Sequence, residues 1–171
     1  MTAVERTHAV AQETDAVHPL GAHGELKAQR FDGPLTDTEL NALLNLLIET
    51  IRAGAKVAAV FACRASCQDK RGMYLDIQAD ACKAVQGLSR LLRARGQEPS
   101  EATNGFFERA MDLPEKADRV AFFLRGQAWL LATLTEALPH LPEAEVKAVF
   151  ADCIETVRRN SERATAYKAG H

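Results

Sequence analysis

The segment from Arg119 to Thr135 limits the possible folds of this 171-residue chain more than any other stretch. It reads RVAFFLRGQAWLLATLT, which is long enough for several helical turns and apolar on almost every side. A helix that is hydrophobic all round is normally buried among other helices. The segment is interrupted by Arg125-Gly126-Gln127 and contains no Asp or Glu. Because an unpaired buried charge is very costly, we expect Arg125 to be buried against a carboxylate from another helix.

Three further long helices are expected where apolar residues repeat at helical spacing. Thr36 and Glu39 form the sequence pattern of a capping box at the start of the first helix. Gly96 is the expected stop of the second helix, and Asp112 the expected cap of the third. The four long helices are therefore expected at about residues 36–66, 72–94, 115–140 and 142–167.

These segments predict an all-α fold, because no segment alternates with the period of two that strands require. We expect an antiparallel four-helix bundle over residues 35–167, with a short extra helix at residues 105–111 between helices two and three. Residues 1–34 hold three histidines and several glycines and prolines, so they are set apart as an N-terminal tail. This tail is either disordered or forms a short helix that docks on the bundle or on a second subunit of a homodimer.

Charge and hydropathy exclude several classes of partner. Lys and Arg number 21 against 23 Asp and Glu, so nucleic acid and anionic membranes have little electrostatic support. No uncharged apolar run is long enough to span a bilayer, and the first residues lack the pattern of a signal peptide. The cytoplasm is therefore the expected location, and the four cysteines are expected to be reduced thiols.

A buried polar site is expected near the middle of the bundle, where acids and bases from different helices share core-facing positions. Its candidate residues are Glu49, Arg52, Asp80, Arg125, Gln127 and Glu155. Two interpretations stay open, because structural networks and binding sites look alike in sequence. In the first, Arg125 pairs with Asp80, Glu155 or Glu49 in a structural network. In the second, the same residues line a small pocket that binds an anion or a polar ligand.

Several motifs resemble an uncharacterised bacterial family with a ferritin-like four-helix bundle. They lie at residues 96–113 and 119–141 and include Glu98-Pro99-Ser100 and Arg125-Gly126-Gln127 followed by Trp129. The resemblance covers about residues 35–165. It implies a ferritin-like fold and, by analogy, an ancestral metal site. In the similar family, acidic or histidine residues stand near the positions of Ile51, Ala81 and Ile154.

A ferritin-like di-iron site needs inward Glu residues and Glu-x-x-His pairs on the bundle helices. Here the only Glu-x-x-His is Glu5 to His8, in the tail. We therefore expect no cofactor and no di-iron site, with Arg125 neutralising the inward acids in place of a cation. The expected role is binding or assembly, with an unidentified ligand or protein partner, rather than catalysis.

The alternative is a metal-binding protein or an oxidoreductase-like metalloprotein. Bundle carboxylates would then hold iron, or thiolates would hold a soft metal such as copper. Cys63 and Cys67 are four residues apart and would share one face of the first helix. The thiolate ligand set would be Cys63, Cys67, Cys82 and Cys153.

Overall fold

The computed structural model describes residues 26, 27 and 29–169, and this part of the chain is all-helical, as the sequence predicts. Residues 1–25 of the N-terminal tail lie outside the described residues, so its two alternatives, disorder or a short docking helix, stay predictions. The helical elements are α1 (Asp37–Cys63), α2 (Gln68–Ala94), α3 (Phe106–Asp112), α4 (Lys116–Ala137), η1 (Leu138–His140) and α5 (Ala144–Ala169). No helix of the described part combines the length and apolar character needed to cross a membrane.

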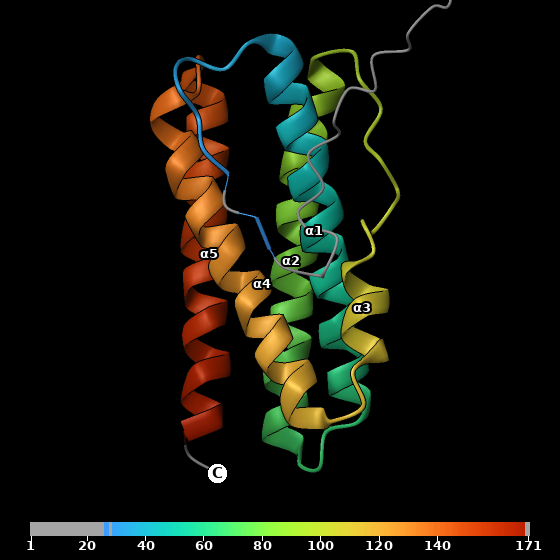
Figure 1. The fold of residues 1–171 in the computed structure, drawn as a ribbon. Helices are drawn as coiled ribbons and strands as arrows, with labels where there is room; N and C mark the ends of the chain where they lie inside the picture. Colours follow the sequence, from blue (N-terminus) through green and yellow to red (C-terminus); the bar gives the residue numbers. More distant parts are fainter. Residues whose placement is uncertain (1–25, 28, 170–171) are drawn as a thin grey trace, which may run out of the picture.

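The four long helices lie side by side, and short α3 lies outside them (Figure 1). α1 packs against α2 and α4, and α5 packs against the same two helices. α3 packs on α1 and α4. In Figure 1, α1 and α5 run downward whereas α2 and α4 run upward, because the linker after α2 returns along the length of the molecule.

Capping residues determine several of the helix ends. The Thr36 hydroxyl accepts a hydrogen bond from the Glu39 N–H at 3.3 Å, and Glu39 Oε2 accepts one from the Thr36 N–H at 2.8 Å. This reciprocal capping box satisfies two of the N–H groups that a helix start leaves free. Gly96 follows α2 with φ of +73°, in the left-handed region that favours glycine at a helix end.

The turn between α1 and α2 is shorter than predicted. α1 ends at Cys63 instead of Ser66, and α2 begins at Gln68 instead of Gly72. Cys67 is the N-cap residue of α2, with extended backbone. The good helix formers that follow it, with Asp69 in the first turn, favour an early start to α2. Cys63 and Cys67 therefore flank the turn, and the prediction that they share one helix face is wrong.

The third long helix also starts differently from its prediction. Asp112 is the last residue of α3, and Glu115 is the N-cap residue of α4. Leu113 has extended backbone, as expected for a residue before proline. Pro114 therefore separates two helices where the sequence pattern placed a single cap.

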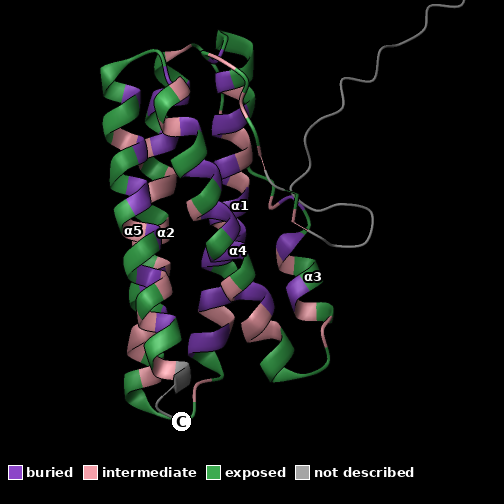
Figure 2. Cartoon of the chain, turned by 60° about the vertical axis from the view of Figure 1, so that its left-hand side comes forward, coloured by how far each residue is buried: buried purple, intermediate pink, exposed green. Residues whose placement is uncertain are grey.

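The apolar core fills the space between the helices, and Figure 2 shows buried residues along all four long helices. The contacts begin before residue 35, because Leu26 packs on this core and Trp129 Nε1 donates to the Lys27 carbonyl at 2.5 Å. One group of fully buried side chains includes Leu44, Leu47, Leu88, Leu92, Leu134 and Phe150, and a second includes Val57, Ile77, Phe106 and Phe123.

At the start of α1, one guanidinium joins the ends of three helices. Arg95, which follows α2, donates to Asp37 at 2.5 Å and to Asn41 at 2.7 Å, both on α1. It also donates to Glu143, just before α5, at 2.8 Å. The Arg95 side chain is only 14% exposed, whereas the Asp37 and Glu143 side chains that it contacts stay more than half exposed.

The linker between α2 and α3 is fixed by polar side chains of α1. Asn45 accepts from the Ser100 N–H at 2.8 Å, and Arg52 Nη1 donates to the Ser100 and Ala102 carbonyls at 2.5 and 3.2 Å. Asn104 donates to the Thr50 hydroxyl at 2.7 Å. α1 therefore binds the core with one face and the linker backbone with another.

Candidate functional site

A small pocket of about 20 Å³, called the central cavity below, is lined by residues from all four long helices. It is not fully enclosed, because the residues Ala81, Ala84 and Thr156 in its α2 and α5 walls are only half-buried. Its lining residues are Ile51 and Gly54 from α1, Ile77, Ala81 and Ala84 from α2, Gln127 and Leu130 from α4, and Thr156, Val157 and Asn160 from α5.

The polar groups of this central cavity are uncharged. Gln127 is 7% exposed and Asn160 is 3% exposed, and the Thr156 hydroxyl completes the set. The Gln127 amide forms no hydrogen bond with any described residue. No carboxylate, imidazole or thiol is among the residues that line the cavity.

Small side chains on α1 and α2 leave room for the Gln127 amide. A Cβ atom at Gly54 would lie 3.6 Å from Gln127 Nε2, in ordinary contact. Ala81 and Ala84 face the cavity from α2. The cavity therefore exists because three small residues oppose one large polar side chain across the core.

Asp80 of α2 is held by two guanidinium groups of α5. Its Oδ2 accepts from Arg159 at 3.0 Å and from Arg163 at 3.2 Å, and its side chain is 15% exposed. Arg163 also donates to Asn160 Oδ1 at 3.4 Å. A polar chain thus runs from Asp80 through Arg163 to Asn160 in the cavity wall.

Arg125 is exposed, so the prediction that it is buried against a carboxylate is wrong. Its guanidinium carbon lies 5.5 Å from the centroid of the Phe122 ring, a cation–π contact. The neighbouring positions Ala128 and Ala132 are also exposed. Alanine counts as apolar in the sequence pattern, but it is also common on exposed helix faces. The alanines of this helix therefore made its exposed face look buried, and Arg125 was wrongly placed in the core. Arg125 therefore does not neutralise inward acids.

The remaining predicted residues do not converge on the centre. Glu155 lies on the exposed side of α5 and pairs with Arg158. Glu49 is half-buried and forms no ion pair within the described residues, and Arg52 binds the linker instead. Of the six predicted site residues, Gln127 lines the cavity and Asp80 is linked to it through Arg163.

Sequence reasoning missed Asn160 and Thr156. Asn160 continues the buried stripe of α5, three residues after Val157 and seven after Cys153. A polar residue on an otherwise apolar helix stripe was therefore the available signal. Thr156 gave no such signal, because threonine is common on either face of a helix.

Residues 38–166 match the family described as a domain of unknown function, DUF6306. The chain belongs to this family. The match reaches from the start of α1 into the last turns of α5, so every residue that lines the central cavity lies within the DUF6306 domain. No curated protein and no solved structure matches the chain.

The DUF6306 domain keeps its four cysteines apart as free thiols. Cys63 ends α1, Cys67 caps α2, and Cys82 is exposed within α2. Cys153 is buried, and this burial raises the pKa of its thiol to about 12. Among the described residues, no group of three or more His, Cys, Asp or Glu side chains is placed to hold a metal ion.

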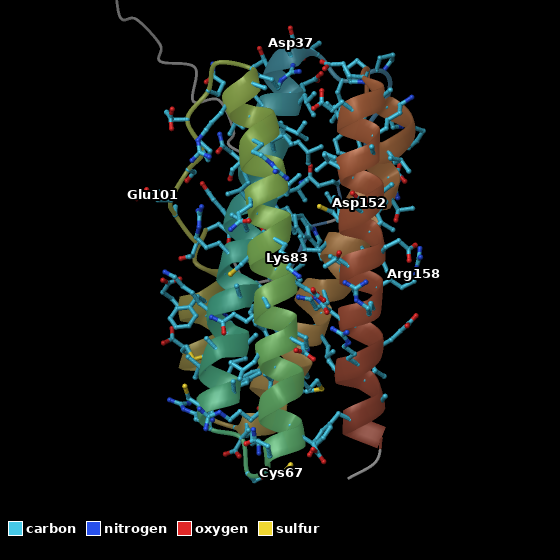
Figure 3. All side chains as sticks on the ribbon, turned by 180° about the vertical axis from the view of Figure 1, so that it is seen from behind. Asp37, Cys67, Lys83, Glu101, Asp152 and Arg158 are labelled. Carbon is cyan, nitrogen blue, oxygen red and sulfur yellow. The ribbon has the colours of Figure 1, made fainter. Side chains whose placement is uncertain are left out.

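Cys67 differs from the other thiols of the DUF6306 chain. It lies at the lower end of the molecule in Figure 3, and its Sγ is 3.0 Å from the Tyr167 hydroxyl of α5. Hydrogen bonds from this hydroxyl and from the Lys70 N–H lower the pKa of the Cys67 thiol. The same contact raises the pKa of Tyr167 to about 12. The Cys67 thiol therefore ionises more readily than an ordinary cysteine thiol, because its pKa is lowered.

We expect Cys67 to react first when the native protein is alkylated with iodoacetamide at pH 7. Its lowered pKa supplies more thiolate, which is the reactive form. Tyr167→Phe removes the hydroxyl, so the pKa of Cys67 should rise and its alkylation should slow several-fold. Peptide mass spectrometry over a series of pH values measures both effects, with exposed Cys82 as the internal control. Equal rates for Cys67 and Cys82 in both proteins would contradict this expectation.

Proposed function

We propose that this chain is a ferritin-like four-helix bundle without a di-iron site, acting in binding or assembly rather than in metal catalysis. The proposal rests on the lining of the central cavity. Ile51 and Ala81 face it, and these are positions at which the ferritin-like resemblance implies acidic or histidine residues. Ile154, the third such position, is buried in the apolar core.

The order and direction of the helices support the ferritin-like assignment. α1 with α2 and α4 with α5 make two hairpins, and the linker between them crosses the length of the molecule. One long crossover connection between two helical hairpins is the arrangement of ferritin-like folds. Short α3 is an addition carried by this crossover.

The donor set at the centre suits a neutral hydrogen-bonding molecule better than metal ions. Two iron ions at close range need several carboxylates to offset their charge. Gln127, Thr156 and Asn160 offer uncharged oxygens and N–H groups, and the surrounding side chains are apolar. Arg163 bonds to Asn160 and adds positive charge beside the cavity, which opposes a cation there.

The proposed binding or assembly role, which we place in the cytoplasm, does not involve nucleic acid. The near balance of 21 basic and 23 acidic residues gives no charged field for nucleic acid. We infer that the chain acts as a homodimer or binds a protein or small-molecule partner.

Metal analysis of full-length protein purified without chelator tests this proposal. After anaerobic incubation with Fe(II) and desalting, we expect well below one iron per chain and no accelerated oxidation of Fe(II). The matched control carries Ser at Cys63, Cys67 and Cys82, and it should give the same result. About two irons per chain in both proteins would overturn the proposal in favour of carboxylate-bound iron. Metal lost only from the Ser variant would support the thiolate alternative. Light scattering on the same preparation distinguishes a dimer from a monomer.

A further inference from the structure

We propose that Asn104, in the linker between α2 and α3, is a site of spontaneous deamidation, which folding suppresses and which detaches the linker from α1 once it occurs. The inference concerns the DUF6306 domain by itself and does not rest on the proposed function. It is carried by three features of the structure, namely the turn that contains Asn104, the hydrogen bond of its amide to α1 and the burial of its side chain.

Asn104 and Gly105 occupy the centre of a tight turn that leads into α3. The Phe106 N–H donates to the Thr103 carbonyl at 3.2 Å, and Asn104 and Gly105 both have positive φ, at +43° and +75°. Two positive φ values in succession are typical of a type I′ turn, which favours Asn followed by Gly. This is the only Asn-Gly pair in the sequence. The shape of the turn therefore accounts for a pair of residues that is chemically labile.

Deamidation of Asn104 uses the backbone of Gly105 as the nucleophile. The deprotonated Gly105 nitrogen attacks Cγ of Asn104, the Cγ–Nδ2 bond breaks, and Nδ2 takes up a proton from water and leaves as ammonia. Water then opens the five-membered succinimide at either carbonyl, which yields aspartate or isoaspartate. Asparagine is a thermolabile residue in proteins, and a following glycine favours the attack because no Cβ atom shields its nitrogen.

The hydrogen bond to Thr50 restrains the Asn104 side chain in the folded protein. Nδ2 donates to the Thr50 hydroxyl at 2.7 Å, and this hydroxyl is itself fixed because it donates to the Leu46 carbonyl at 2.8 Å. Asn104 is 8% exposed and Thr50 is 2% exposed, so little water reaches the amide. Closure of the succinimide ring expels Nδ2 and so breaks the bond to Thr50. We therefore expect the reaction to proceed from a locally opened linker.

Conversion of Asn104 replaces a buried neutral amide by a carboxylate. A carboxylate has no hydrogen to donate, so the contact survives only if the Thr50 hydroxyl leaves Leu46 and donates in its place. The Oδ1 atom of Asn104 is already buried without a hydrogen-bond partner among the described residues. Burying a charge with so few donors is costly, and isoaspartate also lengthens the main chain of the turn. Deamidation therefore releases the linker from this part of α1.

Peptide mass spectrometry of the full chain, incubated at mildly alkaline pH in native and in urea-unfolded form, tests whether folding suppresses the reaction. We expect Asn104 to deamidate rapidly in urea and slowly in the native protein. Thr50→Val removes the acceptor of Nδ2 and should speed the native reaction by about two- to tenfold, the effect of one lost hydrogen bond on local opening. Thr50→Ser keeps the hydroxyl and is the matched control. Equal rates in urea and in native protein, or in the two Thr50 variants, would contradict the inference.

Asn104→Asp reproduces the aspartate product and tests whether the linker is released. Amide hydrogen exchange in α3 should become several-fold faster than in the native protein. Asn45→Asp is the matched control, because Asn45 accepts from the Ser100 N–H at 2.8 Å and a carboxylate keeps that bond. Should Asn104→Asp not fold, native protein aged to partial deamidation gives the same comparison within one sample. Exchange in α3 that is no faster after conversion of Asn104 than in Asn45→Asp would overturn the inference.

Discussion

Phe106→Ala is expected to lower the free energy of unfolding by about 3–5 kcal/mol, the usual cost of removing a fully buried Phe ring. Phe106 is 2% exposed, and its ring stacks on Phe122 with centroids 4.7 Å apart. It is the first residue of α3, so its ring fastens the linker and α3 to α4. Urea and thermal unfolding measure the loss, which corresponds to a decrease in Tm of roughly 6–20 °C for a chain of this length.

Phe107→Ala is the matched control, because it deletes the same ring from the next position. Phe107 is only half-buried, and Lys56 Nζ lies 6.0 Å from its ring centroid. We expect a loss of about 1 kcal/mol, since a half-buried ring gives up much less contact with the core. Equal losses for the two variants would show that Phe106 does not fasten α3.

Gly126→Ala is expected to destabilise the protein by about 1–3 kcal/mol, the typical cost of overpacking a core. A Cβ atom at Gly126 would lie 2.5 Å from Cζ and 2.8 Å from Cε2 of Phe106. The buried Phe106 ring would have to move away from Phe122 to make room. This effect opposes the usual gain of about 1 kcal/mol when alanine replaces glycine inside a helix. Urea unfolding of the variant measures the net change.

Gly87→Ala supplies the control for helix propensity. A Cβ atom there would meet only Val149 Cγ1, at 3.6 Å, which is an ordinary contact. This variant should therefore gain up to about 1 kcal/mol. Combining Gly126→Ala with Phe106→Leu should cost less than the sum of the two single losses, because the shorter side chain relieves the clash. A strictly additive double variant would place the cause of the loss elsewhere.

The helical fold could be predicted from local signals in the sequence. The Thr36–Glu39 capping box and Gly96 act through nearby backbone groups, so their consequences do not depend on the rest of the fold. The start of α2 was harder to predict from the sequence. It depends on how tightly the chain can turn after Cys63, and no residue in the turn is a strong stop signal.

The candidate site was only partly predictable. Gln127 was identified because an amide interrupts an apolar helix, and its burial agrees with that reasoning. The partner of Asp80 was not predictable, because the choice between Arg125 and the arginines of α5 depends on which helices are neighbours. α2 packs along α5, so Asp80 meets Arg159 and Arg163 of that helix.

The binding of the linker by α1 determines which surface positions of the chain are free to vary. On most bundle helices a polar residue outside the core can be exchanged at little cost. Asn45 and Arg52 stand at such positions, yet each holds backbone groups of a segment about 50 residues further along the chain. A library that randomises α1 should therefore tolerate few substitutions on either face. The outer side of α5, where Glu155 and Arg158 bond to each other, should tolerate substitutions, tags or labels better than α1 does.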